Sequence, residues 1–403
     1  MSNSRFMAWT VWMIGSIFYA YQYIIRVMPS IMMNDIMGQF HIDVATFGQF
    51  SGVYYLGYSL IHLPLGILLD RYGPRTVMSI CMLLVALGMT PILFTDHWVY
   101  PILGRVLIGI GSSAAILGVF KIIRMTFAEE RFTRMLSFSV TIGLLGAIYG
   151  GDPLRYMCQS LGYKAVVEIL ILMGIALAVL TYVIVPKMNN ITSDDSILTN
   201  IKTVLTNKKV LGCCLFAGFM VGPIEGFADV WGPSFLKQVY GYEANVASGL
   251  PSMIFIGMCF GGPLLSLIAE RTKQYLGTII GAGVLMALIF FVLCFSHPTT
   301  TTATVGFAIV GICCAYQILA IYKASTYVSE NLVGLTTAIA NMIIMIFGYA
   351  FHSIIGALIA MNGGVDSPSA FICGILFIPI ALLLGATGFL IISISDKKKA
   401  ALD

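Results

Sequence analysis

Long runs of apolar residues follow one another along almost the whole chain. Each run holds about 20 residues, the length that an α-helix needs to cross the hydrocarbon core of a bilayer. Charged residues, or clusters of glycine, proline and asparagine, separate one run from the next. The pattern predicts an all-α polytopic membrane protein with twelve spans, near residues 7–30, 45–69, 75–95, 98–124, 134–156, 163–186, 209–233, 246–269, 275–296, 302–324, 332–361 and 368–394.

The composition supports lipid as the main solvent of this chain. Of its 403 residues, 59% are hydrophobic and 10% are charged, whereas soluble domains carry about 25% charged residues. So few charges could not cover the surface of a soluble fold of this size. The composition therefore excludes a soluble enzyme, a disordered protein and a secreted disulfide scaffold. The nine cysteines lack the spacing of zinc or haem sites, and we expect them to pack as small apolar residues.

The longest polar interruption lies at the middle of the chain and follows Pro186. We interpret this segment, residues 187–208, as a cytoplasmic linker. It divides the chain into an N-terminal bundle of six helices, residues 1–186, and a C-terminal bundle of six helices, residues 209–403.

Lysine and arginine residues gather in alternate loops, and this bias predicts the orientation. The loops on the side of the N-terminus hold Arg5, Arg71, Arg75, Arg131, Arg134, Lys187, Lys202, Lys208, Lys209, Arg271, Lys273 and Lys397 to Lys399. The opposite loops hold Lys164 and Lys237, with Arg155 close by. Because positively charged loops stay on the cytoplasmic side, we expect both termini in the cytoplasm and the protein in the inner membrane. The first run lacks a small-residue cleavage site, so we expect it to remain as a span.

Matching residues in the two halves indicate a duplication. Gly57 matches Gly257, and Asp70-Arg71 matches Glu270-Arg271, at an offset of 200 residues. Two further pairs of segments match at similar offsets. They are Arg26-Val-Met-Pro29-Ser30 with Asp229-Val-Trp-Gly-Pro233-Ser234, where the second half has one inserted residue, and Gly146-Ala-Ile-Tyr149 with Gly348-Tyr-Ala-Phe351. A duplicated six-span unit is typical of a large class of secondary transporters, whose substrate site lies where the halves meet.

Two motifs resemble those of the major facilitator superfamily. Gly66-Ile-Leu-Leu-Asp70-Arg71-Tyr-Gly73-Pro-Arg75, between the second and third spans, resembles the signature loop of that family. Gly104-Arg105-Val-Leu-Ile-Gly109-Ile-Gly111 resembles its fourth-span motif, and residues 326–355 resemble its eleventh span. The resemblance covers the whole chain and implies transport by alternating access. It also implies that Asp70, Arg71 and Arg75 latch the halves on the cytoplasmic side, and that Arg105 is a buried arginine bonded to the first span.

Two details place the chain within that family. The fifth span reads Gly146-Ala-Ile-Tyr-Gly150-Gly151 and lacks the proline of the family's antiporter motif. This departure weakens the case for an antiporter or a drug exporter. The first span, residues 18–26, resembles bacterial nutrient importers, including the phagosomal nutrient transporters of intracellular bacteria.

Polar side chains on the first span form one helical face. Tyr19, Gln22, Tyr23 and Arg26 recur at helical spacing. Ionisable side chains inside spans are costly and usually face a cavity or a partner. We therefore expect these four residues to bind substrate, with an arginine that reaches the external headgroups as the alternative for Arg26.

The seventh span carries acids at equivalent positions. Glu225 and Asp229 lie four residues apart on one face, with Trp231 beyond them. We expect all three to bind substrate, and either acid to exchange a proton with the outside, because burial raises the pKa of a carboxyl group. The alternative is a structural salt bridge from Arg26 to Asp229. On the fourth span, Lys121 is a further candidate for the inner cavity.

No catalytic or cofactor motif accompanies these residues. The sequence has no Walker loop, no H-E-x-x-H and no G-x-S-x-G. It also has no basic patch beyond the loop charges, so we expect no nucleic-acid partner. We expect neither an enzyme nor a cofactor or metal site.

The sequence therefore predicts a monomeric, proton-coupled importer of a small polar solute. Opposite charges on opposite halves favour a zwitterion, either an amino acid or a short peptide. The alternatives are a transporter of organic or phosphorylated anions, an exporter of drugs or metabolites, and a substrate sensor that does not transport.

Overall fold

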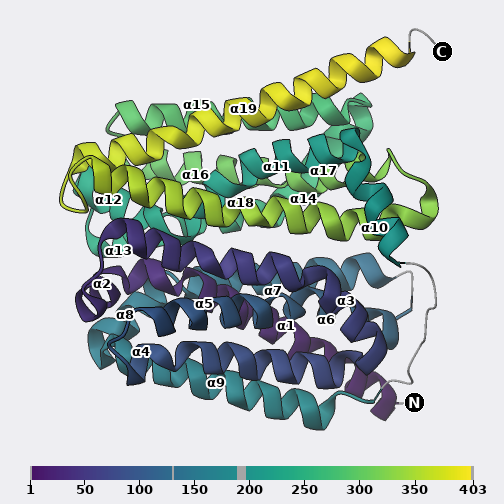
Figure 1. The fold of residues 1–403 in the computed structure, drawn as a ribbon, viewed down its shortest axis with the longest axis horizontal. Helices are drawn as coiled ribbons and strands as arrows, with labels where there is room; N and C mark the ends of the chain where they lie inside the picture. The colour runs from purple at the N-terminus through teal and green to yellow at the C-terminus, as the bar shows by residue number, and fades with distance from the viewer. Residues whose placement is uncertain (1, 129–130, 188–196, 401–403) are drawn as a thin grey trace. The chain divides into compact units, whose positions relative to one another are not determined.

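The computed structural model describes residues 2–128, 131–187 and 197–400. In these ranges every regular element is a helix (Figure 1). The chain divides into two compact units, Met1–Ile42 with Val53–Ser193, and Asp43–Gly52 with Asp194–Asp403. The short segment Asp43–Gly52 therefore belongs to the second unit, although the sequence places it at the start of a span of the first half.

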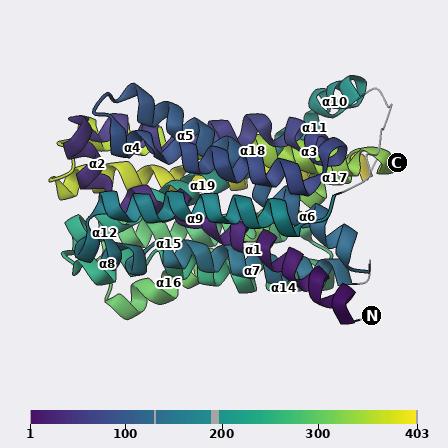
Figure 2. The same ribbon diagram turned by 90° about the horizontal axis from the view of Figure 1, so that it is seen from below.

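The described residues of the first half of the chain form nine helices. Their bounds are α1 Ser2–Ile31, α2 Met33–Phe40, α3 Val44–Met89, α4 Pro91–Phe94, α5 Val99–Ser112, α6 Ala114–Thr126, α7 Phe132–Tyr149, α8 Asp152–Leu161 and α9 Tyr163–Ile184. In this unit α1 packs lengthwise against α7, α6 and α9, and Figure 2 shows α1 beside α7.

The second half of the chain is also built from helices. Their bounds are α10 Ile197–Thr206, α11 Lys208–Gly226, the π-helix η2 Phe227–Trp231, α12 Gly232–Tyr240, α13 Ala244–Gly249, α14 Ser252–Thr272, α15 Tyr275–Phe295, α16 Thr300–Cys314, α17 Tyr316–Ser325, the 3₁₀ turn η3 Glu330–Leu332, α18 Val333–Met361 and α19 Pro368–Ala400. Here α11 packs against α18 and α19, and α14 packs against α16.

The spans follow from these bounds. Within the described ranges, nine helices are long and apolar enough to cross a membrane, or ten if the bent pair α7 and α8 forms one span. One of the nine, Val44–Phe94, has 51 residues, about twice what a bilayer requires. It is divided at Gly73, whose φ of 77° is not helical. The 30-residue α1 is also long enough to cross, and its polar face keeps its hydropathy low. This division of Val44–Phe94, together with α1, accounts for the twelve predicted spans.

The break at Gly73 positions the signature loop between the second and third spans. A φ of 77° and a ψ of 163° lie in a region that is open to glycine and strained for other residues. The following Pro74 cannot donate a backbone hydrogen bond. Together the two residues turn the chain between two helices that would otherwise continue as one.

The expected linker is partly helical. Of residues 187–208, the segment 188–196 lies outside the described residues. The remainder forms α10, and α11 begins at Lys208. The side chain of Asn207 caps α11, because its Oδ1 accepts the backbone amides of Lys209 and Val210. The linker of the sequence interpretation therefore contains a helix of its own.

Equivalent glycines pack equivalent helices together in each unit. A Cβ atom on Gly57 would lie 2.3 Å from the carbonyl oxygen of Val106, and one on Gly257 would lie 2.2 Å from that of Ala308. The second span thus touches the fourth through a glycine, and the eighth span touches the tenth in the same way. The predicted match of Gly57 with Gly257 therefore corresponds to one shared packing contact. Close backbone approach through small residues is a common basis of helix packing in membranes.

The π-helix η2 accommodates the residue that the second half has gained. In η2 the amide of Gly232 donates to the carbonyl of Phe227, five residues earlier, so this turn holds one residue more than an α-helical turn. The insertion between Asp229 and Pro233 lies at this point, whereas α1 is α-helical between Arg26 and Pro29. The π-helical turn therefore accounts for the inserted residue.

We expect Gly257→Ala to destabilise the protein by about 1–3 kcal/mol, because the new methyl group must force α14 and α16 apart. The melting temperature of the purified protein in detergent measures this loss. Gly281→Ala is the matched control, since nothing lies within 4 Å of a Cβ atom at that position. Equal melting temperatures for the two variants would contradict the close contact.

Candidate functional site

The polar face of α1 lies inside the first unit. Arg26 is 7% exposed and Gln22 is 2% exposed. The guanidinium of Arg26 lies over the ring of Tyr23, 5.1 Å from its centroid, and over the ring of Tyr55, 5.2 Å away. Two aromatic faces therefore hold the arginine side chain in one position, which favours the cation through its attraction to the rings.

Residues of α3 complete this face. The Tyr54 hydroxyl donates a hydrogen bond of 2.8 Å to Oε1 of Gln22. On the same helix, Tyr58 stacks on Tyr54 with centroids 6.0 Å apart, and His62 follows Tyr58 at 5.4 Å. Sequence reasoning did not select Tyr54 or Tyr58. Their spacing of four residues, which places side chains on one helical face, was the signal that could have found them.

Arg105 joins α5 to α1 through a carbonyl that the helix itself cannot use. Its Nη1 donates to the carbonyl oxygen of Ile25 at 3.0 Å, and its Nη2 donates to that of Arg26 at 3.5 Å. In an α-helix the Ile25 carbonyl would accept the amide of residue 29, but Pro29 has no N–H. The arginine supplies the missing donor. The bond to the first span that the resemblance implied is therefore present.

The ring of Tyr54 also supports Arg105, whose guanidinium lies 5.3 Å from the ring centroid. Arg105 is 1% exposed, so this charge is removed from water. One tyrosine thus contacts Arg105 through its ring and Gln22 through its hydroxyl. The fourth span, the second span and the polar face of α1 are held together at this point.

The acids of the seventh span lie at the end of α11 and on η2. Asp229 is 1% exposed and Trp231 is fully buried. The Trp231 indole N–H donates to the carbonyl oxygen of His352 at 3.3 Å. The π-helix turns these side chains relative to those of a regular α-helix. Such turns frequently mark functional sites.

Glu225 lines a cavity within the second unit. The other lining residues come from α11, η2, α14, α16 and α17, and they are Val221, Ile224, Ala228, Ile254, Phe255, Met258, Cys314, Tyr316 and Gln317. Most of this wall is apolar, so the carboxylate and the amide of Gln317 are its main polar features. The cavity is small, about 10 Å³, so a carboxylate and an amide there can bind a proton or one small polar group of a solute.

Sequence reasoning did not select Tyr316 or Gln317. Gln317 donates to Oδ1 of Asn341 at 3.4 Å, and the Tyr316 hydroxyl donates to the carbonyl oxygen of Ala217 at 2.9 Å. The first contact orients an amide beside the cavity, and the second fixes α17 against α11. Both side chains are polar but uncharged, and charge within a span was the signal that selected the other candidates.

Lys121 and the signature loop meet in the first unit. The Lys121 Nζ atom lies 2.6 Å from Oδ1 of Asp70. Arg75 lies over the ring of Tyr182, 4.5 Å from its centroid, and Arg71 lies over Tyr72. Lys121 therefore pairs with the loop that was expected to act as a latch. Its role as a substrate ligand and the latch role of the loop both stay predictions.

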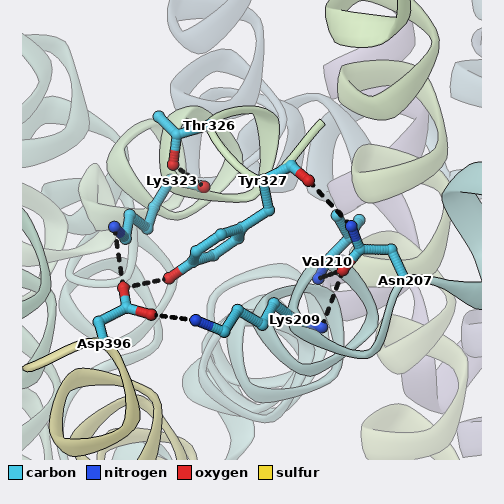
Figure 3. Close-up of polar contacts among 7 residues, drawn as sticks. All are labelled: Asn207, Lys209, Val210, Lys323, Thr326, Tyr327 and Asp396. Carbon is cyan, nitrogen blue, oxygen red and sulfur yellow. Dashed lines mark hydrogen bonds and ion pairs between the residues drawn. The ribbon is translucent and has the colours of Figure 1, made fainter. Parts of the chain in front are cut away.

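The second unit has a related cluster at the ends of α11, α17 and α19 (Figure 3). Asp396 accepts hydrogen bonds from Lys209 at 2.6 Å and from the Tyr327 hydroxyl at 2.5 Å. Its other ion pair is with Lys323, at 3.0 Å. Lys323 and Lys121 lie 202 residues apart, so equivalent lysines bind carboxylates on different helices in the two units.

Two further polar side chains have local partners. Arg155 pairs with Asp152 at 2.8 Å on one turn of α8. His352 is buried, and its Nδ1 lies 2.7 Å from the carbonyl oxygen of Gly348. Among the described residues, no group of three or more His, Cys, Asp or Glu could hold a metal ion.

We expect Arg105→Lys to lower stability by about 1.5–3 kcal/mol, since a lysine cannot reach the Ile25 carbonyl while its charge lies over Tyr54. The melting temperature in detergent measures this. Arg155→Lys is the control, because a partly exposed ion pair contributes about 0–1 kcal/mol. A similar small loss in both variants would contradict the role of Arg105 as the donor to α1.

The chain matches the family model described as Major Facilitator Superfamily over residues 11–351. It is similar to the uncharacterized transporter YybO of Bacillus subtilis (strain 168), with 24% identity over 64% of this chain and 66% of that protein. It is also similar to the nitrite extrusion protein of that organism, with 22% identity over 79% of each chain. Its identity with the hexuronate transporter of the same organism is 21%, over 62% of this chain and 63% of that one. The chain thus spans less than two thirds of the length of YybO and of the hexuronate transporter.

Solved structures show the same fold. A bacterial homologue of the human lysosomal transporter Spinster aligns with a TM-score of 0.72 and 16% identity over 95% of this chain and 98% of that chain. The nucleoside transporter NupG aligns with a TM-score of 0.75 and 14% identity over 94% and 99% of the two chains. The family match covers most of the residues, and the glycine contacts, the signature loop and the buried Arg105 agree with it. The chain belongs to the major facilitator superfamily.

Proposed function

We propose that the protein imports a small polar solute across the inner membrane by alternating access, as a proton-coupled monomer with both termini in the cytoplasm. An amino acid or a short peptide is the favoured solute class. Arg26 carries this proposal, because it is a buried cation on a spanning helix, held between the rings of Tyr23 and Tyr55. Such a residue is expensive in a membrane, and its usual use is to bind an anionic group of a solute or an ion pathway.

Arg26 suits a carboxylate in particular. The rings of Tyr23 and Tyr55 fix the side chain, and the planar guanidinium can donate two parallel hydrogen bonds to one carboxylate. Gln22 lies on the same helical face, and Tyr19 contacts Tyr23 with centroids 5.3 Å apart. Amide and phenol groups beside a guanidinium can recognise further polar atoms of a small solute. This face supports binding of the acidic end of the solute.

Glu225 supports the other part of the proposal. Its carboxylate is the acid of a largely apolar cavity wall. It can bind an ammonium group, which a zwitterion supplies, or it can take up the coupling proton. Asp229, one helical turn further on, is the second candidate for the proton. These roles explain why acids occupy these positions in the second unit.

A second candidate is an organic anion. Two relatives are named for organic anions, which are hexuronate and galactarate or D-glucarate, and a third is named for the inorganic anion nitrite. Arg26 would serve such a solute as well as it serves an amino acid, but Glu225 would repel it unless it were protonated. The presence of an ammonium group on the ligand therefore distinguishes an amino acid or peptide from an organic anion.

Conformational control is proposed for Asp70, Arg71, Arg75 and Arg105. The bond from Lys121 to Asp70 restrains the signature loop, and charge-assisted bonds of this kind are strong when dry but exchange with water when exposed. Asp70 is 65% exposed, so its bond to Lys121 can break and form again at modest cost. This supports a switching role for the loop rather than a fixed structural one.

The first test identifies the ligand and then removes Arg26. A thermal-shift screen of amino acids, dipeptides, nucleosides and organic acids finds compounds that raise the melting temperature. We expect Arg26→Ala to weaken the affinity for such a ligand by about tenfold to a hundredfold, the range of charge-assisted hydrogen bonds. Arg26→Lys should restore it only partly, because lysine lacks the planar pair of donors. Arg155→Ala is the control. Unchanged affinity in Arg26→Ala would contradict the proposed anion site.

The second test separates proton coupling from binding. We expect Glu225→Gln to abolish uptake driven by a pH gradient in proteoliposomes, and to spare exchange of substrate between preloaded compartments, which needs no net proton movement. Glu243→Gln, at an exposed position before α13, is the control and should retain both activities. Uptake driven by the pH gradient in Glu225→Gln would contradict the coupling role. Recovery of transport in a charge-swapped pair of Arg26 and Asp229 would support a structural salt bridge instead.

A further inference from the structure

Side-chain contacts around Asp396 join the ends of three helices of the second unit. We call Asn207, Lys209, Lys323, Tyr327 and Asp396 the Asp396 cluster (Figure 3). The amide of Asn207 donates to the backbone carbonyl of Tyr327 at 2.9 Å. The start of α11, the segment after α17 and the last turns of α19 are thus joined by side chains.

The cluster carries more positive than negative charge. Two ammonium groups share one carboxylate, and each ammonium has three donors. Both also lie over the Tyr327 ring, Lys209 at 5.1 Å and Lys323 at 4.8 Å from its centroid. Burial, together with the hydrogen bond to Asp396, raises the pKa of the Tyr327 hydroxyl, so this group stays a proton donor at neutral pH. The two lysines, which are 35% and 23% exposed, retain donors for a second anion.

Further exposed lysines continue from the cluster along the same helices. Lys208 precedes Lys209 at the start of α11, and Lys397 and Lys398 follow Asp396 in α19; all three are exposed. Lys202 is exposed on α10, which ends one residue before Asn207. Figure 1 shows α10 and the last turns of α19 at the same end of the second unit. Four more exposed lysines therefore lie on or next to the helices that the cluster joins.

The helix α10 adds an apolar component beside these lysines. Val204 is buried, whereas Leu205 is 40% exposed and lies three residues from Lys202. A short helix whose exposed face carries both a lysine and an apolar side chain is suited to the boundary between headgroups and acyl chains. An exposed leucine adds nothing to the binding of a soluble anion, but it can contact the acyl chain of a lipid.

We propose that the Asp396 cluster and its surrounding lysines bind the headgroup of an anionic phospholipid, in the leaflet that faces this end of the second unit. Lys209 and Lys323 donate to the phosphate, Lys208, Lys397 and Lys398 add electrostatic attraction, and α10 lies at the boundary with the acyl chains. Groups of four or more lysines immediately beyond a span attract acidic lipids in this way. The site is separate from Arg26 and Glu225 in sequence and in chemistry, and it does not depend on the identity of the transported solute.

The test uses the full chain in detergent, titrated with dioleoylphosphatidylglycerol or with dioleoylphosphatidylcholine. We expect the first lipid alone to raise the melting temperature. The triple variant Lys208→Gln, Lys397→Gln and Lys398→Gln should need about a hundredfold more phosphatidylglycerol for half of the effect, roughly fivefold for each lysine. Native mass spectrometry should show a matching loss of bound phosphatidylglycerol. An unchanged titration in the triple variant would overturn the proposal.

A matched control separates a site from general positive charge. Arg271 and Lys273 are also exposed and lie at the same end of the unit, where Tyr275 contacts Tyr322 with centroids 5.1 Å apart. We expect Arg271→Gln with Lys273→Gln to leave the phosphatidylglycerol titration unchanged. An equal loss per charge in this control would show diffuse attraction and overturn the site. An equal rise in melting temperature with sodium phosphate at the same concentration would assign the site to free phosphate instead of lipid.

Asp396→Asn tests whether the cluster itself takes part. The variant should melt at a lower temperature without lipid, because Lys209 and Lys323 lose their anionic partner. It should also bind phosphatidylglycerol about fivefold more tightly, since one negative charge that competes with the headgroup is gone. Unchanged or weaker binding in a folded variant would show that the two lysines do not contact the headgroup, and would contradict the proposal.

Discussion

A backbone carbonyl inside a membrane must find its hydrogen-bond donor within the protein, because hydrocarbon supplies none. Pro29 leaves the Ile25 carbonyl of α1 without its helical donor, and Arg105 donates to it at 3.0 Å. The same guanidinium lies over Tyr54, which donates to Gln22. Arg105, Pro29 and the polar face of α1 are thus linked through direct contacts. The position of the proposed anion site depends on these contacts.

The second unit meets the same constraint in another way. Pro233 lies at the start of α12, and the π-helix η2 precedes it, where the amide of Gly232 donates to the carbonyl of Phe227. The wider turn carries Asp229 and Trp231, and the matching segment of α1, which carries Arg26, is α-helical. The two units therefore share the glycine contacts that pack their helices, but they differ at the turn that carries their charged residues.

Charges at the helix ends follow a different rule, because water and headgroups are available there. Lys121 binds Asp70 in the signature loop, and the equivalent Lys323 binds Asp396 at the end of α19. The first pair leaves Asp70 largely exposed, which suits a contact that opens and closes. The second pair is joined by Lys209 and Tyr327 and fixes three helices, which suits a stable binding surface. Equivalent lysines thus support a movable contact in one unit and a fixed one in the other.

The sequence by itself determined the number and order of the spans, the duplicated unit, the polar face of α1 and the acids of the seventh span. These features depend on local chemistry. A run of apolar residues, a charge within such a run and a glycine that recurs at a fixed offset are all visible in the sequence without knowledge of the fold. The tertiary structure alone showed that Tyr54 contacts both Gln22 and Arg105, that Glu225 shares a cavity with Gln317, and that Lys121 pairs with Asp70. It also showed α10 inside the expected linker and the link between Lys209, Lys323 and Asp396. Those contacts join residues that lie far apart in the chain, and such contacts follow from how the helices pack and not from the pattern of any single helix.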